Sequence, residues 1–419
     1  MIDLNKFFRI LCFIFTIIFV FSSFSPFAIC FENEETIENE NYEISSLLSS
    51  LETNTSPSKE PETNSTHIIA IDRNSSRILF EKNAYTKTPM ASTTKIITAI
   101  IAIEECKLDE IVEISSKAAS TNGSTLGITK GTTMSIRDLL YGLMLRSGND
   151  CAVAIAEHIG GSLENFSNIM NSKAKQIGLN NSNFVTPHGL DDPNHYTTAY
   201  ELAILTNYAL NNKTFLEIVK TKTTTVNCGN NIKTISNTNE LLGNYEGVYG
   251  VKTGFTFGAG RCLVTACKRN NLDIIVVVLG ADTKKIRTTD SVKVLNYVFT
   301  NYTNYDIKDI IYENFEQFES YFKNNIIIEK STDTCDLKLS SPTNTTFPLQ
   351  KNEFSNIDLK IFSINKLTAP TLANTKIGVL NVQLGHEILI SLDILLNNNI
   401  NKKTWQIYYL EILQNFFKL

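Results

Sequence analysis

Residues 92–103 read Ser-Thr-Thr-Lys-Ile-Ile-Thr-Ala-Ile-Ile-Ala-Ile, and this segment decides how the middle of the chain folds. The dense apolar residues predict a buried helix, and a serine suits its first turn. Such a start places Ser92 and Lys95 one turn apart on the same face. The amine can then take the proton of the hydroxyl, provided that Lys95 is neutral. Taken alone, the segment is also typical of a capped core helix with a solvated lysine.

The Ser-x-x-Lys spacing is common in this chain, so its meaning depends on context. Copies occur at Ser56/Lys59, Ser172/Lys175, Ser320/Lys323 and Ser363/Lys366. The Ser92 copy is followed in order by Ser147-Gly148-Asn149 and by Lys252-Thr253-Gly254, and Lys-Thr-Gly occurs only once. Together the three motifs could supply a nucleophile, its base, a proton relay and an anchor for a carboxylate, as a serine acyl-transfer enzyme requires.

Length, composition and charge agree with a folded enzyme. The chain has 419 residues, of which 42% are hydrophobic, and a net charge of -5. This is enough for two domains plus tails, and it leaves no basic surface typical of nucleic-acid binding. Nucleic acid is therefore excluded as an expected partner.

The N-terminal residues 1–30 are predicted to be a signal peptide. Lys6 and Arg9 precede an apolar run at 10–21, and small residues follow. A lipid attached to Cys30 and an uncleaved membrane anchor are the alternatives. Residues 31–65 are acidic and then rich in Ser, Thr, Pro and Asn, so they predict a disordered tether.

Six cysteines follow the signal region at wide, irregular spacing. This pattern predicts neither a disulfide framework nor a zinc site, and most of these cysteines are expected to be small buried apolar residues. Cys262 and Cys267 are predicted to lie in one strand on opposite faces, because they are an odd number of residues apart.

The pattern along the chain indicates an α+β fold. Strands are predicted at 68–71 and 77–80, and a hairpin at 262–268 and 272–280. Helical spacing covers residues 92–106, 136–146 and 152–159 and leaves Ser147 in a break between two helices.

Two further parts are predicted beyond residue 300. Short apolar runs within residues 305–397 suggest a small all-β domain. In residues 400–419, an apolar side alternates with a polar one at helical spacing, which predicts an amphipathic helix lying in a membrane interface. Packing of this helix on the β-domain is the alternative. The apolar residues are Trp405, Tyr409, Ile412, Phe416 and Leu419.

The region from about His67 to Phe299, here taken as a domain at 66–300, resembles the D-alanyl-D-alanine carboxypeptidases of the low-molecular-weight penicillin-binding family. The similar segments are Ala91 to Lys95, Leu139 to Asp150, Pro187 to Asp191, His195 to Tyr200, and Val251 to Gly254. The resemblance implies a β-lactamase/transpeptidase-like domain, in which an antiparallel sheet is flanked by a helical cluster and the active site lies where they meet. It also implies a small all-β domain after the catalytic one.

The resemblance assigns a role to each motif residue. Ser92 would be the nucleophile, Lys95 the general base and Ser147 the proton relay. The backbone N–H groups of Ser92 and Phe255 would form the oxyanion hole, and Phe255 replaces a histidine or small polar residue of some relatives. No cofactor and no metal are expected. The substrate-binding residues would be Asn149, Lys252, Thr253, Gly254, Phe255 and Arg287.

The implied activity is removal of the terminal D-alanine from peptidoglycan stem peptides, at the outer face of the cytoplasmic membrane or in the cell wall. A β-lactamase would need a Glu-x-x-x-Asn pattern between the second and third motifs. Glu164/Asn168 and Glu240/Asn244 have this pattern, but neither pair lies where the resemblance would place it. We therefore expect β-lactam antibiotics to acylate the enzyme and the acyl-enzyme to be hydrolysed slowly. A non-catalytic peptidoglycan-binding protein and an endopeptidase remain alternatives. His188 and His195 are predicted to make structural hydrogen bonds.

Overall fold

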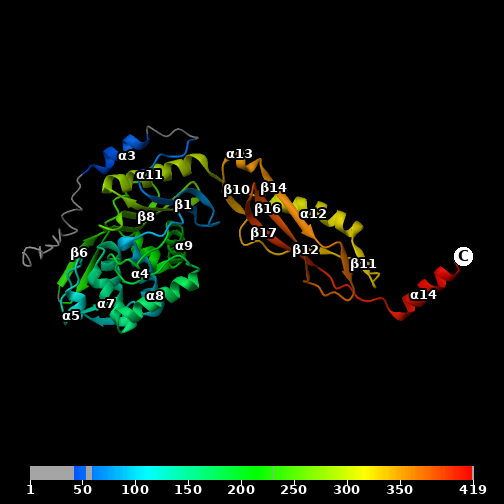
Figure 1. Ribbon diagram of the computed structural model, residues 1–419, viewed down its shortest axis with the longest axis horizontal. Coiled ribbons are helices and arrows are strands. Elements are labelled where there is room, and N and C mark those ends of the chain that lie inside the picture. Colours follow the sequence, from blue (N-terminus) through cyan, green and yellow to red (C-terminus); the bar gives the residue numbers. More distant parts are fainter. Residues whose placement is uncertain (1–41, 53–58, 230, 418–419) are drawn as a thin grey trace, which may run out of the picture. The chain divides into compact units, whose positions relative to one another are not determined.

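The computed structural model describes residues 42–52, 59–229 and 231–417 (Figure 1). The predicted signal peptide and the first part of the predicted tether lie outside the described residues.

A five-stranded antiparallel sheet forms the centre of the first domain, with strand order β2-β1-β9-β8-β7. The β9 sequence, Leu-Asp-Ile-Ile-Val-Val-Val-Leu-Gly-Ala, is almost continuously apolar because this strand is buried on both faces. Asn270 and Asn271 form the turn between β8 and β9 with φ of 50° and 64°, which asparagine tolerates well. The bounds are β1 His67–Asp72, β2 Ile78–Lys82, β7 Val248–Thr256, β8 Gly260–Arg269 and β9 Leu272–Ala281.

Each face of this sheet has its own core. Helix α11, Lys284–Asn301, covers one face, and the larger helical cluster covers the other (Figure 1). Cys262 belongs to the core of the helical cluster and Cys267 to the core beneath α11, so the prediction of opposite faces is confirmed. The six described cysteines are free thiols.

The helical cluster is built as the apolar spacing predicts. A 3₁₀ turn η1, Ala91–Thr94, leads into α4, Lys95–Glu105, and a loop joins α6, Ile136–Leu145, to α7, Asn149–Gly160. The other helices are α5 Ser116–Ala119, α8 Leu163–Ile177, α9 Ala199–Leu210 and α10 Lys213–Lys220. Two strand pairs complete the domain, namely β3 Ile111–Glu113 with β4 Thr133–Ser135, and β5 Thr223–Cys228 with β6 Asn231–Ser236.

The prediction of a disordered tether is wrong for part of residues 31–65. Helix α3, Ile44–Glu52, packs Ile44, Leu48 and Leu51 against the core beneath α11. Further along, the backbone N–H and the hydroxyl of Ser65 donate to Asp290 of α11 at 2.7 and 2.6 Å. The segment is therefore held by apolar packing of α3 and by hydrogen bonds of Ser65, neither of which its composition indicates.

The C-terminal domain consists mainly of strands, as its apolar runs predict. A four-stranded sheet with order β12-β17-β16-β14 packs against α12, Lys308–Asn325, which buries Ile311, Phe315 and Phe322. The strands are β10 Thr303–Asp306, β11 Ile327–Glu329, β12 Leu337–Leu339, β13 Thr346–Leu349, β14 Ile357–Ser363, β15 Lys366–Thr368, β16 Lys376–Leu384 and β17 Glu387–Leu396. Helix α13, Lys351–Phe354, is one turn long.

The chain then forms α14, Trp405–Phe416, which buries none of its own residues. Within the described ranges, no helix is both long enough and apolar enough to cross a membrane.

Candidate active site

Ser92 and Lys95 lie at the junction between η1 and α4. Ser92 is in the 3₁₀ turn rather than at a helix cap, and Lys95 is the first residue of the α-helix. The Lys95 side chain is fully buried, and its Nζ lies 2.8 Å from Ser92 Oγ. The predicted one-turn relation between the two side chains is therefore present as a direct hydrogen bond.

Two further acceptors hold the amine of Lys95. Its Nζ donates to Asn149 Oδ1 at 2.7 Å and to the carbonyl oxygen of His188 at 3.0 Å. A neutral amine has two N–H donors and one lone pair, so it can donate to these two oxygens and still accept a proton from Ser92. The arrangement thus suits a lysine that acts as a base towards the serine.

The second motif occupies the loop between α6 and α7. Ser147 is 7% exposed and has a φ of 61°, and it lies two residues before Asn149, the first residue of α7. The Asn149 amide nitrogen donates to the carbonyl of Asn122 at 2.7 Å. The Asp150 carboxylate accepts from the backbone N–H groups of residues 126–128, which fixes this loop beside the motif.

The third motif lies on β7 at the edge of the sheet. Lys252 is 1% exposed and its Nζ donates to the carbonyl of Thr253 at 2.9 Å. The Thr253 and Thr238 hydroxyls lie 2.7 Å apart. Consecutive residues of this strand thus contribute a cation and a hydroxyl.

Gly254 brings β7 against the nucleophile. A Cβ at this position would lie 3.0 Å from the backbone nitrogen of Ser92 and 3.1 Å from Ala91 Cβ. Only a glycine therefore permits this approach without displacing η1. Gly254 directly precedes Phe255, so the same contact brings the backbone of Phe255 towards Ser92. The backbone N–H groups of Ser92 and Phe255 are the two predicted oxyanion donors.

The Phe255 side chain has partners of its own. The Arg261 guanidinium carbon lies 3.9 Å from the centre of the Phe255 ring, and the Phe257 ring packs edge-on with its centroid 5.6 Å away. These contacts fix the aromatic ring of Phe255 at a position where some relatives have a histidine or a small polar residue.

The two histidines make the structural hydrogen bonds that were predicted. His188 Nδ1 accepts from the N–H of Leu190, and His195 Nδ1 accepts from the N–H of Val185. Burial lowers the pKa of His188 to about 3. Burial also lowers the pKa of His195 to about 4. Both rings are therefore neutral at pH 7, and His195 Nε2 can donate to Thr94 Oγ1 at 2.8 Å.

Arg287 is buried on α11 and donates to Glu240 at 3.3 Å. Lys284 also pairs with Glu240 at 3.1 Å, and the hydroxyls of Thr288 and Tyr42 donate to it. Burial acts to raise the pKa of Glu240, but Arg287 and these hydrogen bonds outweigh it and lower that pKa. This carboxylate is therefore committed to an ion-pair network, and the substrate-binding role of Arg287 stays a prediction.

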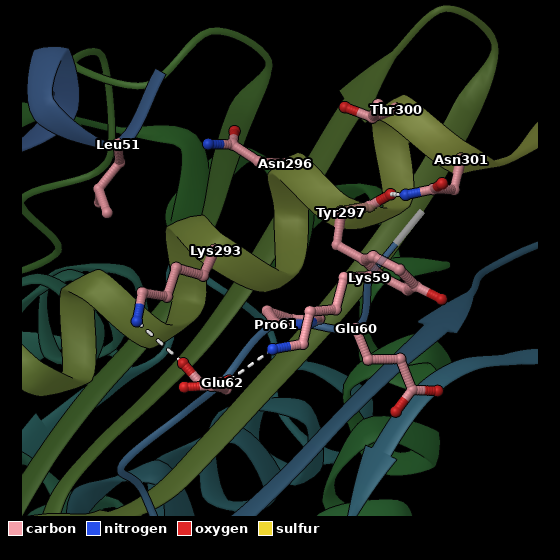
Figure 2. Close-up of a pocket in the computed structure, with 10 residues that line it drawn as sticks. All are labelled: Leu51, Lys59, Glu60, Pro61, Glu62, Lys293, Asn296, Tyr297, Thr300 and Asn301. Atoms are coloured by element: carbon pink, nitrogen blue, oxygen red, sulfur yellow. Dashed lines mark hydrogen bonds and ion pairs between the residues drawn. The ribbon is translucent and has the colours of Figure 1, made fainter. Parts of the chain in front are cut away.

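A separate pocket of about 230 Å³ lies along α11 (Figure 2). Glu62 there pairs with Lys59 at 2.7 Å, and its carbonyl accepts from Lys293 at 2.8 Å. The lining residues are Leu51, Lys59, Glu60, Pro61, Glu62, Lys293, Asn296, Tyr297, Thr300 and Asn301, none of which belongs to the three motifs.

The structure adds two contributors that the sequence did not reveal. The His188 carbonyl helps to hold Lys95, and Thr238 contacts Thr253. A backbone carbonyl has no sequence signature, and Thr238 lies in no motif. The position of His188 in Thr-Pro-His-Gly-Leu was the only available signal for this loop.

Comparisons with known proteins give the same family. Residues 53–283 match the family model described as D-alanyl-D-alanine carboxypeptidase, and residues 315–402 match the model of the penicillin-binding protein 5 C-terminal domain. The chain is 36% identical to the D-alanyl-D-alanine carboxypeptidase DacF of Bacillus subtilis over 57% of this chain and 63% of that protein, which is less than two thirds of its length.

A second relative is matched over most of its length. The D-alanyl-D-alanine carboxypeptidase DacA of Haemophilus influenzae is 31% identical over 82% of this chain and 86% of that protein. The solved structure of penicillin-binding protein 5 from the same organism superposes with a TM-score of 0.68 at 27% identity, covering 82% of this chain and 99% of that one. Together with the three motifs assembled around Ser92, these matches show that the chain belongs to the D-alanyl-D-alanine carboxypeptidase family of low-molecular-weight penicillin-binding proteins.

Proposed function

We propose that this protein is a serine-type carboxypeptidase that removes the terminal D-alanine from peptidoglycan stem peptides. The observation that carries the proposal is the hydrogen bond of 2.8 Å between Lys95 Nζ and Ser92 Oγ, inside a buried site that also contains Asn149. A serine with an amine base at this distance meets the geometric requirement for an activated nucleophile.

In the acylation step, Ser92 Oγ attacks the carbonyl carbon of the bond between the two terminal D-alanines. The Oγ proton passes to the lone pair of Lys95, and a tetrahedral oxyanion forms. The backbone N–H groups of Ser92 and Phe255 stabilise this charge. The C–N bond then breaks, and the leaving amine takes a proton through Ser147, so that D-alanine departs and an ester to Ser92 remains.

Deacylation reverses the same roles with water as the nucleophile. Lys95 accepts a proton from water as it attacks the ester, and Ser92 Oγ regains a proton when the C–O bond breaks. The peptide shortened by one D-alanine is released.

The terminal carboxylate of the substrate supplies the recognition element. Lys252 provides a buried cation on β7, and the next residue, Thr253, provides a hydroxyl. A charge-assisted hydrogen bond to a carboxylate is stronger than a neutral one, so a free C-terminus is preferred over an amide. A β-lactam with a carboxylate would bind at the same place and acylate Ser92.

The proposal extends to the cellular location. Residues 1–30 would direct export, and α14 would hold the enzyme at the outer face of the cytoplasmic membrane. Support comes from aromatic and aliphatic side chains of α14 that are more than half exposed, namely Trp405, Tyr409, Leu410, Ile412 and Phe416. Exposed aromatic and aliphatic side chains on a helix favour its insertion into a membrane interface over its exposure to water. Co-sedimentation with anionic vesicles, lost in a chain that ends at Asn401, tests the anchor.

The activity is tested by D-alanine release from diacetyl-lysyl-D-alanyl-D-alanine. The full chain in mild detergent is compared with Ser92→Ala and with Ser172→Ala. Ser172 is a matched control because it is in another Ser-x-x-Lys pair, and its hydroxyl instead donates to the Asn168 carbonyl on α8. Release by the parent and by Ser172→Ala, but not by Ser92→Ala, is the expected result.

Other outcomes would change the assignment. Acylation by a fluorescent penicillin without any D-alanine release would favour a non-catalytic binding protein. Cleavage of cross-linked dimers in preference to the small peptide would favour an endopeptidase.

A further inference from the structure

A side-chain cluster at the far end of the helical cluster lies outside the active site. Cys106 ends α4, Glu110 is in the following loop, and His158 is in the last turn of α7. The Cys106 sulfur, a Glu110 carboxylate oxygen and a His158 ring nitrogen all lie within 4.8 Å of one another. These are three chemically different metal ligands brought together from three segments. The spacing of the cysteines predicted no zinc site. It could not reveal this cluster, because only one of the three residues is a cysteine.

We propose that Cys106, Glu110 and His158 bind a divalent d-block cation, with zinc as the best fit, and that this ion joins the ends of α4 and α7. Thiolate, imidazole and carboxylate are the ligands that zinc takes in proteins, and three protein ligands leave a fourth position for water. Bonds of about 2.0–2.3 Å to zinc place tetrahedral ligand atoms ~3.5 Å apart. The three atoms need to move by only about an ångström to reach this geometry.

The present contacts show that two of the ligands already face each other. His158 Nε2 and Glu110 Oε1 lie 2.9 Å apart, with side chains 25% and 43% exposed. A cation between them would replace the proton that they share. The site is therefore open enough for an ion to enter and partly sheltered from water.

The surroundings are negatively charged on balance. Glu110 and Glu105 place negative charge near the Cys106 sulfur. The same charges attract a dication, which would displace the thiol proton and bind the thiolate. Two cations oppose this charge: Lys107 lies near Glu110, and Lys173 lies near Glu105.

The position of the cluster gives the ion a structural role. Helices α4 and α7 are already joined at their first residues, where Lys95 Nζ donates to Asn149 Oδ1 at 2.7 Å. The cluster joins their last turns, so a bound ion would fasten the same pair of helices at the opposite end. An 11-residue helix is ~16 Å long. The ion therefore lies too far from Ser92 to take part in bond breaking.

Metal content and spectroscopy test the proposal on the full chain, purified in detergent without a histidine tag. Parent protein equilibrated with Zn²⁺ and dialysed is expected to retain one ion per chain, and Cys106→Ser and His158→Gln are expected to lose it. Matched controls are His386→Gln, an exposed histidine of the C-terminal domain, and Glu113→Gln, an exposed glutamate on β3. Both controls should retain the ion.

Two more measurements make the result decisive even if one variant folds poorly. Co²⁺ in place of Zn²⁺ should give a thiolate charge-transfer band in the parent that is absent from Cys106→Ser. Added Zn²⁺ should raise the unfolding temperature of the parent and of His386→Gln but not that of His158→Gln, because only a native-state site gains from the ion. Absence of zinc from the dialysed parent, or equal retention by all variants, would overturn the proposal.

Discussion

Asn149 Oδ1 lies 2.7 Å from Lys95 Nζ and accepts a hydrogen bond from it, so the first residue of α7 helps to set the state of the base on α4. A neutral amide oxygen can accept from a neutral amine without stabilising the ammonium form as a carboxylate would. This relationship leads directly to the first prediction.

Asn149→Asp is expected to slow acylation of Ser92 by about 100-fold or more at pH 7, because the new carboxylate would favour the ammonium form of Lys95. The remaining activity should appear only at higher pH. The rate of reaction with a fluorescent penicillin, measured across pH, checks this. Asn168→Asp on the exposed face of α8 is the control, and an unchanged pH profile in Asn149→Asp would contradict the assigned role.

Gly254→Ala is expected to reduce the free energy of unfolding by about 1–3 kcal/mol. It should also slow acylation at least about 10-fold, because its Cβ would meet the Ser92 backbone nitrogen at 3.0 Å. Gly258→Ala, in the same hairpin, is the control, because its Cβ would meet the Asp191 carboxylate at 3.0 Å and not η1. Equal effects of the two variants on the acylation rate would show that the contact with η1 is unimportant.

Arg287 and Glu240 can be separated by their effects on substrate binding. Arg287→Gln and Glu240→Gln should each lower stability by about 1–3 kcal/mol, because each leaves part of a buried network unpaired. Only Arg287→Gln should raise KM for a peptide with a free carboxylate, if the guanidinium binds that group. Steady-state kinetics and urea unfolding on both variants provide the data. An equal KM in both would restrict Arg287 to its ion pair.

His195 is expected to make the fold sensitive to mild acid. Its pKa is about 4 in the folded protein and 6.5 ordinarily, so the unfolded state binds more protons between these values. The stabilisation is complete above pH 6.5 and is lost as the pH falls towards 4. His195→Gln should show a flatter dependence of unfolding free energy on pH in this window. His386→Gln is the control, and an equally steep curve in His195→Gln would contradict the prediction.

Much of the catalytic domain could be predicted from sequence because its signals are local. The apolar run after Lys95 predicts α4, and the Asn270-Asn271 pair predicts the hairpin of β8 and β9. The one-turn spacing of Ser92 and Lys95 predicts a contact that the structure contains. In each case the residues that form the feature are neighbours in the chain.

The features that sequence did not reveal depend on distant partners. Helix α3 has only a few leucines in a polar segment, and its burial depends on α11 more than 230 residues later. The pairing of Arg287 with Glu240 is likewise a tertiary contact between segments with no shared motif. The meeting of Cys106 with His158 arises because two helices end at the same place.

The position of β7 at the edge of the sheet has a consequence for substrate choice. An edge strand offers unpaired main-chain groups, to which an extended peptide can align as an additional strand. Recognition through main-chain groups depends little on the side chains of the visiting peptide. If the proposed function holds, the composition of the substrate peptide before its terminal D-alanines should therefore have little effect on its binding.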